Sequence, residues 1–296
     1  MSDRWAVSSL QNHELELVIL PGIGGRLWDV VFQGHSLLFQ NRDLVGQAFD
    51  ETHLASLPTR SPQFGFPLWG GEKTWIAPDK LWTDGAPFPS LDSGPYLVIS
   101  NDVTHVELTS PVCSLSQLSV SRRISLMSAT SWNITHTVTN HGPSPRETGI
   151  WSVMMIDTPA KIGVAMDTPQ VHPVFGNAGS PIAKNANCVV ADCARQQEFK
   201  VGLPNPNGAT LIKFGNTGPW LICTTHPPLP QDNFAHQFPV EVFNSGDYPY
   251  CEAEWHSPKS DLRPGEALKF QQDFRIWPND APPAPDAPKE LFSCMS

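Results

Sequence analysis

The stretch Tyr250-Cys251-Glu252-Ala253-Glu254-Trp255-His256 places an ionisable side chain at every second position. A β-strand points successive side chains to opposite faces, so Glu252, Glu254 and His256 would share one face. Neighbouring members of this trio would then lie roughly 6.5–7 Å apart. The alanine and the tryptophan between them would occupy the buried face. The trio therefore lines either solvent, as on an exposed edge strand, or a pocket that exchanges protons with a polar substrate.

The composition predicts an all-β protein. Thirty prolines and 21 glycines interrupt the 296 residues every few positions, and long helical periodicity is missing. This pattern is typical of short strands joined by turns. Hydrophobic residues make up 40% of the chain, which can supply a sizeable core, and charged residues make up only 16%. We therefore expect many antiparallel strands in one domain.

The strand patterns extend over most of the chain and suggest no internal repeat or linker. We expect one domain over 1–277, followed by a proline-rich tail, 278–296, of which 278–288 lies on the surface or is disordered. Region 60–90 has little regular pattern and many aromatic residues, and region 158–210 favours loops with weaker strands, including 198–201. The clearer strands are expected at 15–20, 26–32, 36–39, 96–100, 103–108, 117–124, 132–139, 148–156, 210–214, 219–225, 239–244, 250–256 and 267–276.

Charge and hydropathy argue against several classes of partner. The net charge of −10, with no run of lysine or arginine, argues against nucleic acid and anionic membrane surfaces. The chain has no apolar stretch of 18 residues and no N-terminal pattern of a secretory signal. We therefore expect a cytoplasmic monomer or homodimer whose partner is a small molecule.

The cysteines and histidines do not show the spacing of a metal site. The six cysteines lack paired spacing, so we expect free thiols, with a bridge between Cys188 and Cys193 as the alternative. No HxH or HExxH motif is present either, and no metal centre is expected. The histidines His226, His236 and His256 could still converge with the two glutamates of the strand.

The segment Trp69-Gly70-Gly71-Glu72-Lys73-Thr74-Trp75, followed by Trp82, combines tryptophans with a cation. The apolar face of a sugar ring stacks on an indole, while charged groups bind its hydroxyls. This combination favours a pocket role for Lys73 and Trp75. In the alternative, structural interpretation the tryptophans lie in the core and Glu72 pairs with Lys73 at the surface.

The order of several segments resembles the galactose mutarotase-like superfamily, which includes the aldose 1-epimerases. The string Trp69–Trp75 is most similar to an uncharacterised mutarotase-like family. The resemblance extends over residues 15–276 and implies a β-supersandwich with an open carbohydrate-binding face. The segments that carry it are Val18–Arg26 with Gly34–Leu38, Trp69–Gly71 with Pro78, Ser119–Leu126 with Ile134–Asn140, and the trio followed by Leu262–Glu266.

The resemblance also implies a chemistry. In the superfamily a glutamate near the C-terminus takes the proton from the anomeric hydroxyl, and a central histidine protonates the ring oxygen. By its position the base is Glu252, with Glu254 as the alternative. Trp151 stands in the place of the histidine, and an indole cannot act as a general acid at neutral pH. His256 and Lys73 are the replacements that we expect first.

The neighbouring residues in the sequence suggest roles for several further side chains. The two glutamates of one face would repel each other, which raises the pKa of at least one of them towards that of a general acid. Arg26 follows a glycine turn and either forms a structural salt bridge or contacts substrate. His136 and His141 flank a turn and are expected to be structural or solvated. The expected substrate-binding residues are Arg26, Glu72, Trp75, Trp82 and Trp151.

Together these patterns predict a carbohydrate-active isomerase or epimerase that uses general acid–base catalysis without a cofactor. One alternative is a carbohydrate-binding protein without catalysis, in which the aromatic cleft remains after loss of the central histidine. Another alternative is a lyase, cyclase or epimerase acting on a polyhydroxylated or secondary-metabolite substrate, because one scaffold can host different chemistries.

Overall fold

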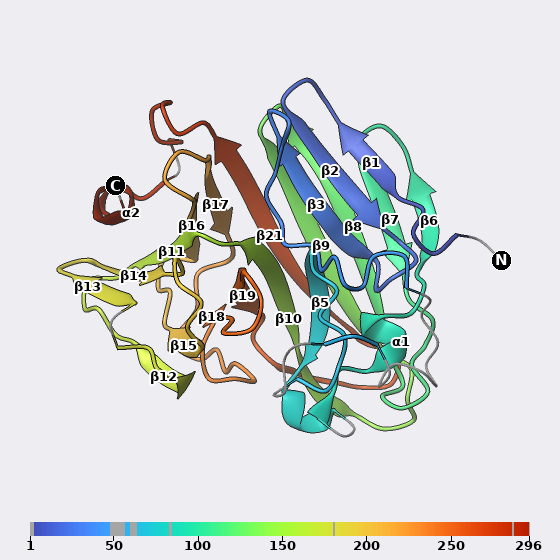
Figure 1. The fold of residues 1–296 in the computed structure, drawn as a ribbon. Coiled ribbons are helices and arrows are strands. Elements are labelled where there is room, and N and C mark those ends of the chain that lie inside the picture. Colours follow the sequence, from blue (N-terminus) through green and yellow to red (C-terminus); the bar gives the residue numbers. More distant parts are fainter. Residues whose placement is uncertain are drawn as a thin grey trace.

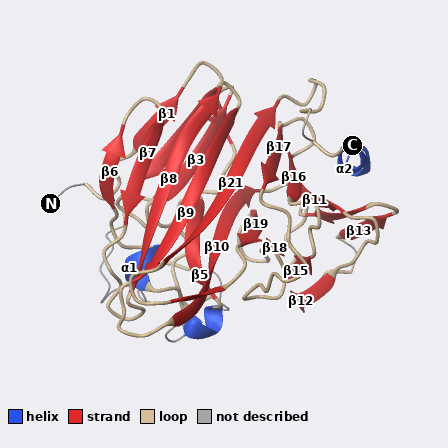
Figure 2. Ribbon diagram, turned by 180° about the vertical axis from the view of Figure 1, so that it is seen from behind, coloured by secondary structure: helices blue, strands red, loops and turns tan. Residues whose placement is uncertain are grey.

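Two twisted antiparallel sheets make up the computed structural model (Figures 1 and 2). The model describes residues 3–47, 57–59, 64–82, 85–179, 181–285 and 287–295. Its helices are short: a 3₁₀ helix (Asp79–Leu81), α1 (Pro89–Asp92) and α2 (Lys289–Met295). This architecture confirms the prediction of an all-β fold of many antiparallel strands.

The first sheet has 11 strands and carries the stretch 250–256 in its interior. Its order is β1-β2-β3-β5-β10-β19-β18-β15-β12, with β4 paired to β3 and β20 paired to β10. The strands are β1 (Ser8–Gln11), β2 (Leu15–Leu20), β3 (Arg26–Phe32), β4 (His35–Ser36), β5 (Glu72–Ala77), β10 (Arg146–Asp157), β12 (His172–Gly176), β15 (Phe199–Leu203), β18 (Val240–Asn244), β19 (Tyr250–His256) and β20 (Ser260–Leu262).

The second sheet has 10 strands and packs against the first. Its order is β13-β14-β11-β16-β17-β21-β9-β8-β7-β6. The strands are β6 (Leu97–Asn101), β7 (His105–Thr109), β8 (Leu118–Ser128), β9 (Ser131–Asn140), β11 (Ala160–Ala165), β13 (Ile182–Asn185), β14 (Cys188–Asp192), β16 (Ala209–Phe214), β17 (Trp220–Thr224) and β21 (Ala267–Trp277).

Most strands lie within a few residues of their predicted positions, but β5 was not expected. It falls in region 60–90, where the sequence shows no alternation of polar and apolar residues. The structure gives the reason, because all six residues of Glu72–Ala77 are buried. A strand that is covered on both faces loses the period-2 pattern by which strands are recognised. The strands β11, β13 and β14 likewise give region 158–210 more regular structure than expected.

Strand β19 separates an apolar core from an ionic face. Ala253 and Trp255 belong to the main hydrophobic core between the sheets, as predicted. The indole Nε1 of Trp255 donates to Thr210 Oγ1 of the second sheet at 3.1 Å. The interpretation of an exposed edge strand is wrong, because β19 lies between β10 and β18 and all its residues are buried. Glu252, Glu254 and His256 therefore face a covered region and not solvent.

A glycine brings β5 close to β3. Gly71 has φ +69°, a left-handed conformation that favours glycine. A Cβ atom at this position would lie 2.6 Å from the carbonyl oxygen of Leu27. This close approach admits no side chain, and it places the residue after it, Glu72, in register with Leu27 of β3. The glycine pair in the predicted sugar-binding segment therefore has a structural function.

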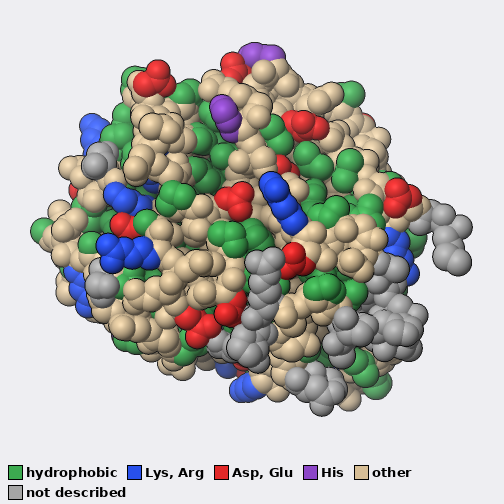
Figure 3. All heavy atoms as spheres, viewed as in Figure 1, with side chains coloured by type: hydrophobic (Ala, Val, Ile, Leu, Met, Phe, Trp, Pro, Cys, Tyr) green, Lys and Arg blue, Asp and Glu red, His purple; other side chains and the backbone are tan. Residues whose placement is uncertain are grey.

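The outer surface carries charges of both signs. Figure 3 shows acidic and basic side chains intermixed on the face that Figure 1 presents. Neutral and hydrophobic side chains separate them, so the visible part of this face forms no extended basic surface.

The C-terminal tail is more ordered than predicted. Helix α2 packs against β11, β14 and β16 of the second sheet. Leu291 and Met295 of this helix are buried in a second hydrophobic cluster with Trp220 and Trp277. The apolar residues at i and i+4 lie on one side of the helix, which explains the docking. The end of the tail, Lys289–Met295, for which the sequence predicted no helix, therefore packs on the second sheet.

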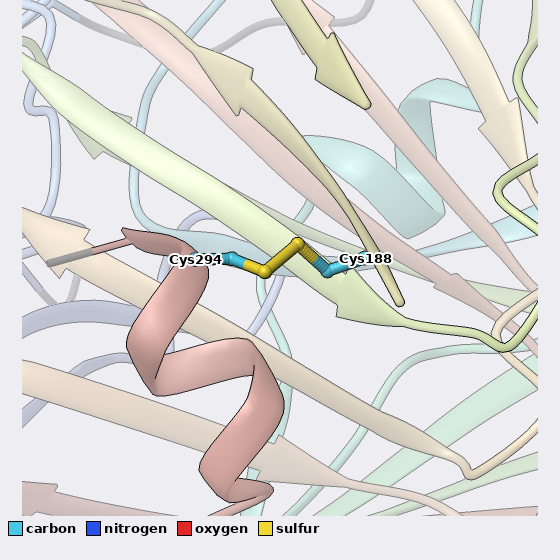
Figure 4. The surroundings of a disulfide bond; sticks show 2 residues. All are labelled: Cys188 and Cys294. Atoms are coloured by element: carbon cyan, nitrogen blue, oxygen red, sulfur yellow. A yellow bond between two sulfur atoms is a disulfide. The ribbon is translucent and has the colours of Figure 1, made fainter. Parts of the chain in front are cut away.

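A disulfide joins this helix to the sheet (Figure 4). Cys188 at the start of β14 pairs with Cys294 of α2, at a sequence separation of 106. The expectation of free thiols is wrong for these two cysteines, and the alternative bridge is also wrong because Cys193 is a free, buried thiol. Disulfides are typical of oxidising compartments, so this pairing weighs against the cytoplasmic location, which remains a prediction.

We predict that the disulfide stabilises the fold through the docked helix. Loss of a native disulfide typically costs about 2–5 kcal/mol, because the reduced unfolded chain gains freedom. Cys294→Ser should lower the free energy of unfolding in denaturant titrations by about this amount, and Cys113→Ser, at a buried free thiol, should lower it less. Thiol titration of the denatured, unreduced protein should find the four free cysteines of the structure. A titre of six would contradict the pairing.

Candidate functional site

An aromatic cavity of about 120 Å³ lies on the outer face of the first sheet. Trp75 of β5 and Trp151 of β10 are partners in the strand ladder, with ring centroids 4.9 Å apart. Trp82 follows β5 and stacks on Trp151 at 5.6 Å with an interplanar angle of 14°. The remaining wall is aromatic or apolar apart from three charged residues, Asp79, Lys200 and Glu252. The structure thus brings together the three predicted tryptophans.

Glu252 and Lys73 form an ion pair beside this cavity. Nζ of Lys73 donates to Oε1 of Glu252 at 3.0 Å, and strand β10 separates the strands that carry them. The ammonium of Lys73 also lies 4.4 Å from the ring centroid of Trp75, a favourable contact between a cation and an indole. The alternative pairing of Glu72 with Lys73 is wrong. Adjacent residues of a strand point to opposite faces, and only Lys73 faces the site.

Glu254 is fully buried and holds two groups of the site in place. Its Oε2 accepts a hydrogen bond from Trp151 Nε1 at 2.7 Å and another from Lys200 Nζ at 2.8 Å. Its Oε1 has no hydrogen-bond partner among the described residues. The ammonium of Lys200 lies 4.6 Å from the Trp151 ring centroid. Glu254 therefore fixes one wall of the cavity and one of its cations.

A second carboxylate, Glu241 of β18, collects three donors on a single oxygen. Lys200 Nζ lies 3.0 Å from Glu241 Oε2, and His256 Nε2 lies 3.1 Å from it. His236 Nδ1 lies 3.2 Å from the same oxygen. The backbone N–H of Asp79 donates to His236 Nε2 at 3.3 Å, which leaves the proton of this imidazole on Nδ1. The two imidazoles and the lysine thus stabilise a buried anion.

Burial and mutual repulsion separate the acidities of these groups. Burial raises the pKa of Glu254 to about 8, with further contributions from Glu241 and Glu252. Burial alone would raise the pKa of Glu241, but Lys200 and the two imidazoles hold it well below its ordinary value. The two carboxyl groups therefore differ in acidity, and Glu254 holds its proton more tightly than Glu241 does. This result agrees with the expectation that one of the strand's glutamates has a raised pKa.

The two lysines of the site, Lys73 and Lys200, have pKa values that are shifted in opposite directions. Burial lowers the pKa of Lys73 below its ordinary value, although Glu252 opposes the shift. Burial acts in the same direction on Lys200, but the carboxylates of Glu254 and Glu241 outweigh it and raise its pKa. Lys73 is therefore the better proton donor, and Lys200 is a permanent cation of the cavity.

His256 is separated from the cavity. Its ring stacks on Trp151 with centroids 5.4 Å apart, and burial lowers its pKa to about 4. It lines a different cleft, of about 530 Å³, which also involves His226 and Lys269. The predicted trio is thus divided. Glu252 lines the cavity, Glu254 binds the Trp151 wall from behind, and His256 lies outside the cavity, on the other side of Trp151.

Two predicted substrate contacts do not line the cavity. Glu72 faces the interior of the sandwich, where its carboxylate pairs with Arg122 and accepts from Ser152 Oγ at 3.0 Å. Arg26 is also buried, and its Nη2 donates to Asp92 Oδ1 at 2.6 Å. The same oxygen accepts from Trp75 Nε1 at 2.7 Å, so Arg26 positions a wall of the cavity through an intermediate carboxylate.

Sequence reasoning missed Lys200, Glu241 and Asp79. Lys200 lies 54 residues before Glu254, on a strand expected to be weak. Lys200, Glu241 and Glu254 come together because β15, β18 and β19 are neighbours in the sheet, and sequence spacing does not indicate that order. Lys200 is the single lysine of a strand that is buried throughout, which is the one signal that could have identified it. His136, expected to be structural or solvated, is fully buried between Thr74 and Gln272.

This chain is similar to known proteins in its structure but not in its sequence. No protein-family model matches the chain, and no curated protein matches it by sequence. A galactose mutarotase-like protein from Lactobacillus casei ATCC 334 is similar with a TM-score of 0.61 and 10% identity, covering 92% of this chain and 100% of that one. An Escherichia coli K12 protein provisionally named aldose 1-epimerase has a TM-score of 0.60 and 14% identity, covering 92% and 99%. The chain has the galactose mutarotase-like fold.

The mutarotase-like fold confirms the expectation drawn from the resemblance of its segments. A further galactose mutarotase-like protein, from Clostridium acetobutylicum, has a TM-score of 0.54 and 10% identity over 93% of this chain and 99% of that one. At such identities the likeness concerns the fold. Among the described residues, none of the helices has the length and apolar content needed to cross a membrane.

We predict that His136 makes the mutarotase-like fold sensitive to acid. Burial lowers the pKa of His136 from its ordinary 6.5 to about 4. Its contribution to stability is therefore complete above pH 6.5 and is lost as the pH falls towards 4, because protonation favours the unfolded chain. At pH 5 the loss amounts to about 2 kcal/mol.

Denaturant titrations at pH 7 and pH 5 test this prediction. In His136→Gln the free energy of unfolding should change less between the two pH values than in the wild type, by about 2 kcal/mol. His13→Gln is the matched control, because the His13 side chain is 76% exposed. Equal pH dependence in the wild type and the His136 variant would contradict the assignment.

Proposed function

We propose that this chain is a carbohydrate isomerase of the aldose 1-epimerase type, acting on a small reducing sugar. The observation that carries the proposal is the Lys73–Glu252 pair beside an aromatic cavity, with 3.0 Å between Nζ and Oε1. A base and an acid at one point are what anomer interconversion requires. The names of the mutarotase-like structures with this fold support the same substrate class.

The proposed reaction consists of two proton transfers that are reversed when the ring closes. Glu252 takes the proton of the anomeric hydroxyl, the bond between the anomeric carbon and the ring oxygen breaks, and Lys73 donates its proton to that oxygen. Rotation about the neighbouring carbon–carbon bond exposes the other face of the aldehyde. Ring closure then returns the proton to Lys73 and the other proton from Glu252 to the sugar. Both residues end in their starting states.

Lys73 is the proton donor that the geometry favours over His256. Burial lowers the pKa of Lys73, which makes its ammonium a stronger acid than that of an exposed lysine. The Nε2 of His256 is instead hydrogen-bonded to Glu241, and the Trp151 ring stacks on its imidazole. In this proposal Lys73 supplies the proton that the superfamily's histidine would donate, so Trp151, which stands in the place of that histidine, has no acid role. It is a wall against which the apolar face of the sugar packs.

The charges around the cavity support a neutral sugar as substrate. The ammonium of Lys200 is already bound to both Glu254 and Glu241, so it is not free to bind an anionic group of the ligand. The cavity of about 120 Å³ is below the about 300–1,000 Å³ of typical small-molecule pockets. We therefore propose a single monosaccharide and not an oligosaccharide.

We predict that Glu252→Gln abolishes anomer exchange. General acid–base catalysis by one positioned group contributes about 10²–10⁴-fold. Exchange NMR on a panel of reducing sugars and sugar phosphates should show faster anomer interconversion of a neutral sugar with wild type, and a loss of this size in Glu252→Gln and in Lys73→Met. Glu147→Gln is the matched control, because Glu147 is an exposed glutamate of the same sheet that pairs with Lys259.

The other outcomes separate the competing functions. Saturable shifts of sugar resonances without faster exchange would replace the isomerase with a carbohydrate-binding protein. A third outcome is that the sugars show neither shifts nor exchange and that a polyhydroxylated substrate yields an unsaturated product that absorbs ultraviolet light. This outcome would replace the isomerase with a lyase. Unchanged exchange in Glu252→Gln would overturn the assignment of the base.

A further inference from the structure

His236, Glu241 and His256 bring three potential metal ligands to one point. Their ligand atoms all lie within 4.8 Å of one another. His256 Nε2 and His236 Nδ1 are 3.1 and 3.2 Å from the same oxygen, Glu241 Oε2. A zinc ion binds nitrogen and oxygen ligands at about 2.0–2.2 Å in a tetrahedron, which sets ligand atoms slightly more than 3 Å apart. The three side chains therefore need only small shifts to surround an ion.

A carboxylate lies near the second ring nitrogen of His236. Metal-bound histidines commonly donate their second ring N–H to a carboxylate. Binding of an ion to Nδ1 would move the proton of this imidazole to Nε2, where Asp79 Oδ1, now 3.6 Å away, would have to accept it in place of the hydrogen bond from the Asp79 N–H. The Nδ1 atom of His256 is buried without a partner among the described residues. An ion at His256 Nε2 would replace the hydrogen bond to Glu241 and move the proton of this imidazole to Nδ1, which no described side chain occupies.

We propose that His236, Glu241 and His256 form a binding site for one first-row divalent transition-metal ion, such as Zn²⁺. Two imidazoles and one carboxylate leave a fourth position open, as in catalytic zinc sites and in the two-histidine, one-carboxylate sites of non-haem iron. The carboxylate and nitrogen donors favour such ions over Ca²⁺ and Mg²⁺, which prefer oxygen ligands alone.

Lys200 is the group that competes with the ion. Its Nζ lies 3.0 Å from Glu241 Oε2, the oxygen that the metal would occupy. The same ammonium has a second acceptor in Glu254 Oε2 at 2.8 Å, so it can release Glu241 without losing all its partners. The site thus exchanges a lysine for a metal ion on one carboxylate oxygen. Removal of the lysine charge is expected to strengthen metal binding.

The proposed metal site borders the aromatic cavity. Lys200 and Asp79 both line the cavity, and each contacts a member of the triad. The isomerase chemistry proposed above does not involve the ion, and the metal site does not depend on that chemistry. The two proposals therefore stand or fall separately, since metal binding is measured without substrate and anomer exchange is measured with a chelator present.

Calorimetric titration of chelator-treated protein with Zn²⁺ tests the site. One equivalent should bind to wild type, and His256→Ala and His236→Ala should weaken binding by at least about 100-fold, since even an outer partner of a ligand contributes 10–100-fold. His226→Ala is the matched control, because His226 is an exposed histidine outside the triad. It should leave binding unchanged.

The lysine variant keeps the test decisive if a histidine variant fails to fold. Lys200→Met should bind Zn²⁺ at least about tenfold more tightly, because a nearby positive charge has been removed. The absorption spectrum of the Co²⁺ form should show ligand-field bands without the intense charge-transfer band of a thiolate, which excludes binding at the cysteines. No binding to wild type and Lys200→Met, or equal binding by the triad variants and wild type, would overturn the proposal.

Discussion

The burial of Glu241, Glu252 and Glu254 in the middle of one sheet is the constraint on which the site depends. An isolated carboxylate in a low-dielectric interior costs several kcal/mol, so each must have a positive partner or take up a proton. Lys73 arrives from β5 on one side, and Lys200 arrives from β15 on the other. Two lysines thus serve three carboxyl groups, and burial raises the pKa of Glu254. The strand order of the sheet therefore determines which charges meet in the site.

The same principle operates on the opposite face of β5. Glu72 points into the sandwich and pairs with Arg122 of β8, while Lys73 points outward and pairs with Glu252. Alternation along one strand thus places two ion pairs on two sides of the first sheet. The inner pair joins the two sheets and the outer pair joins two strands of the same sheet. Because all six residues of β5 are buried, neither pair is screened by solvent as a surface pair would be.

Sequence patterns predicted the fold well where one face of a strand is apolar and the other is polar. The stretch 250–256 is the clearest case, since Ala253 and Trp255 identified the core face and Glu252 and Glu254 the site face. Strand β5 escaped prediction because burial on both faces removed the alternation. The helix α2 escaped because prolines before it suggested a tail, whereas the apolar cluster on which it docks and its disulfide partner lie far away in sequence.

The candidate site was predictable only in part, for a related reason. Trp75, Trp82 and Trp151 were identified by chemical type, and their convergence needed only the pairing of β5 with β10. Lys200 and Glu241 required knowledge that β18 and β15 follow β19 in the sheet. Glu72 was assigned to the cavity because it is next to Lys73 in sequence, and Arg26 because it follows a glycine turn. Both are buried elsewhere, since neighbours in a strand face opposite sides.

Trp151 connects the two halves of the site. Its indole lies between the cavity, where it stacks with Trp82, and the histidine cluster, where it stacks with His256. Its N–H is bound to Glu254, which is also bound to Lys200. A histidine here would offer a proton to the cavity, whereas the tryptophan closes the cavity off from the imidazoles behind it. In the proposed reaction, acid–base chemistry in the cavity is thereby left to Lys73 and Glu252, and in the proposed metal site the imidazoles on Glu241 bind a separate ligand.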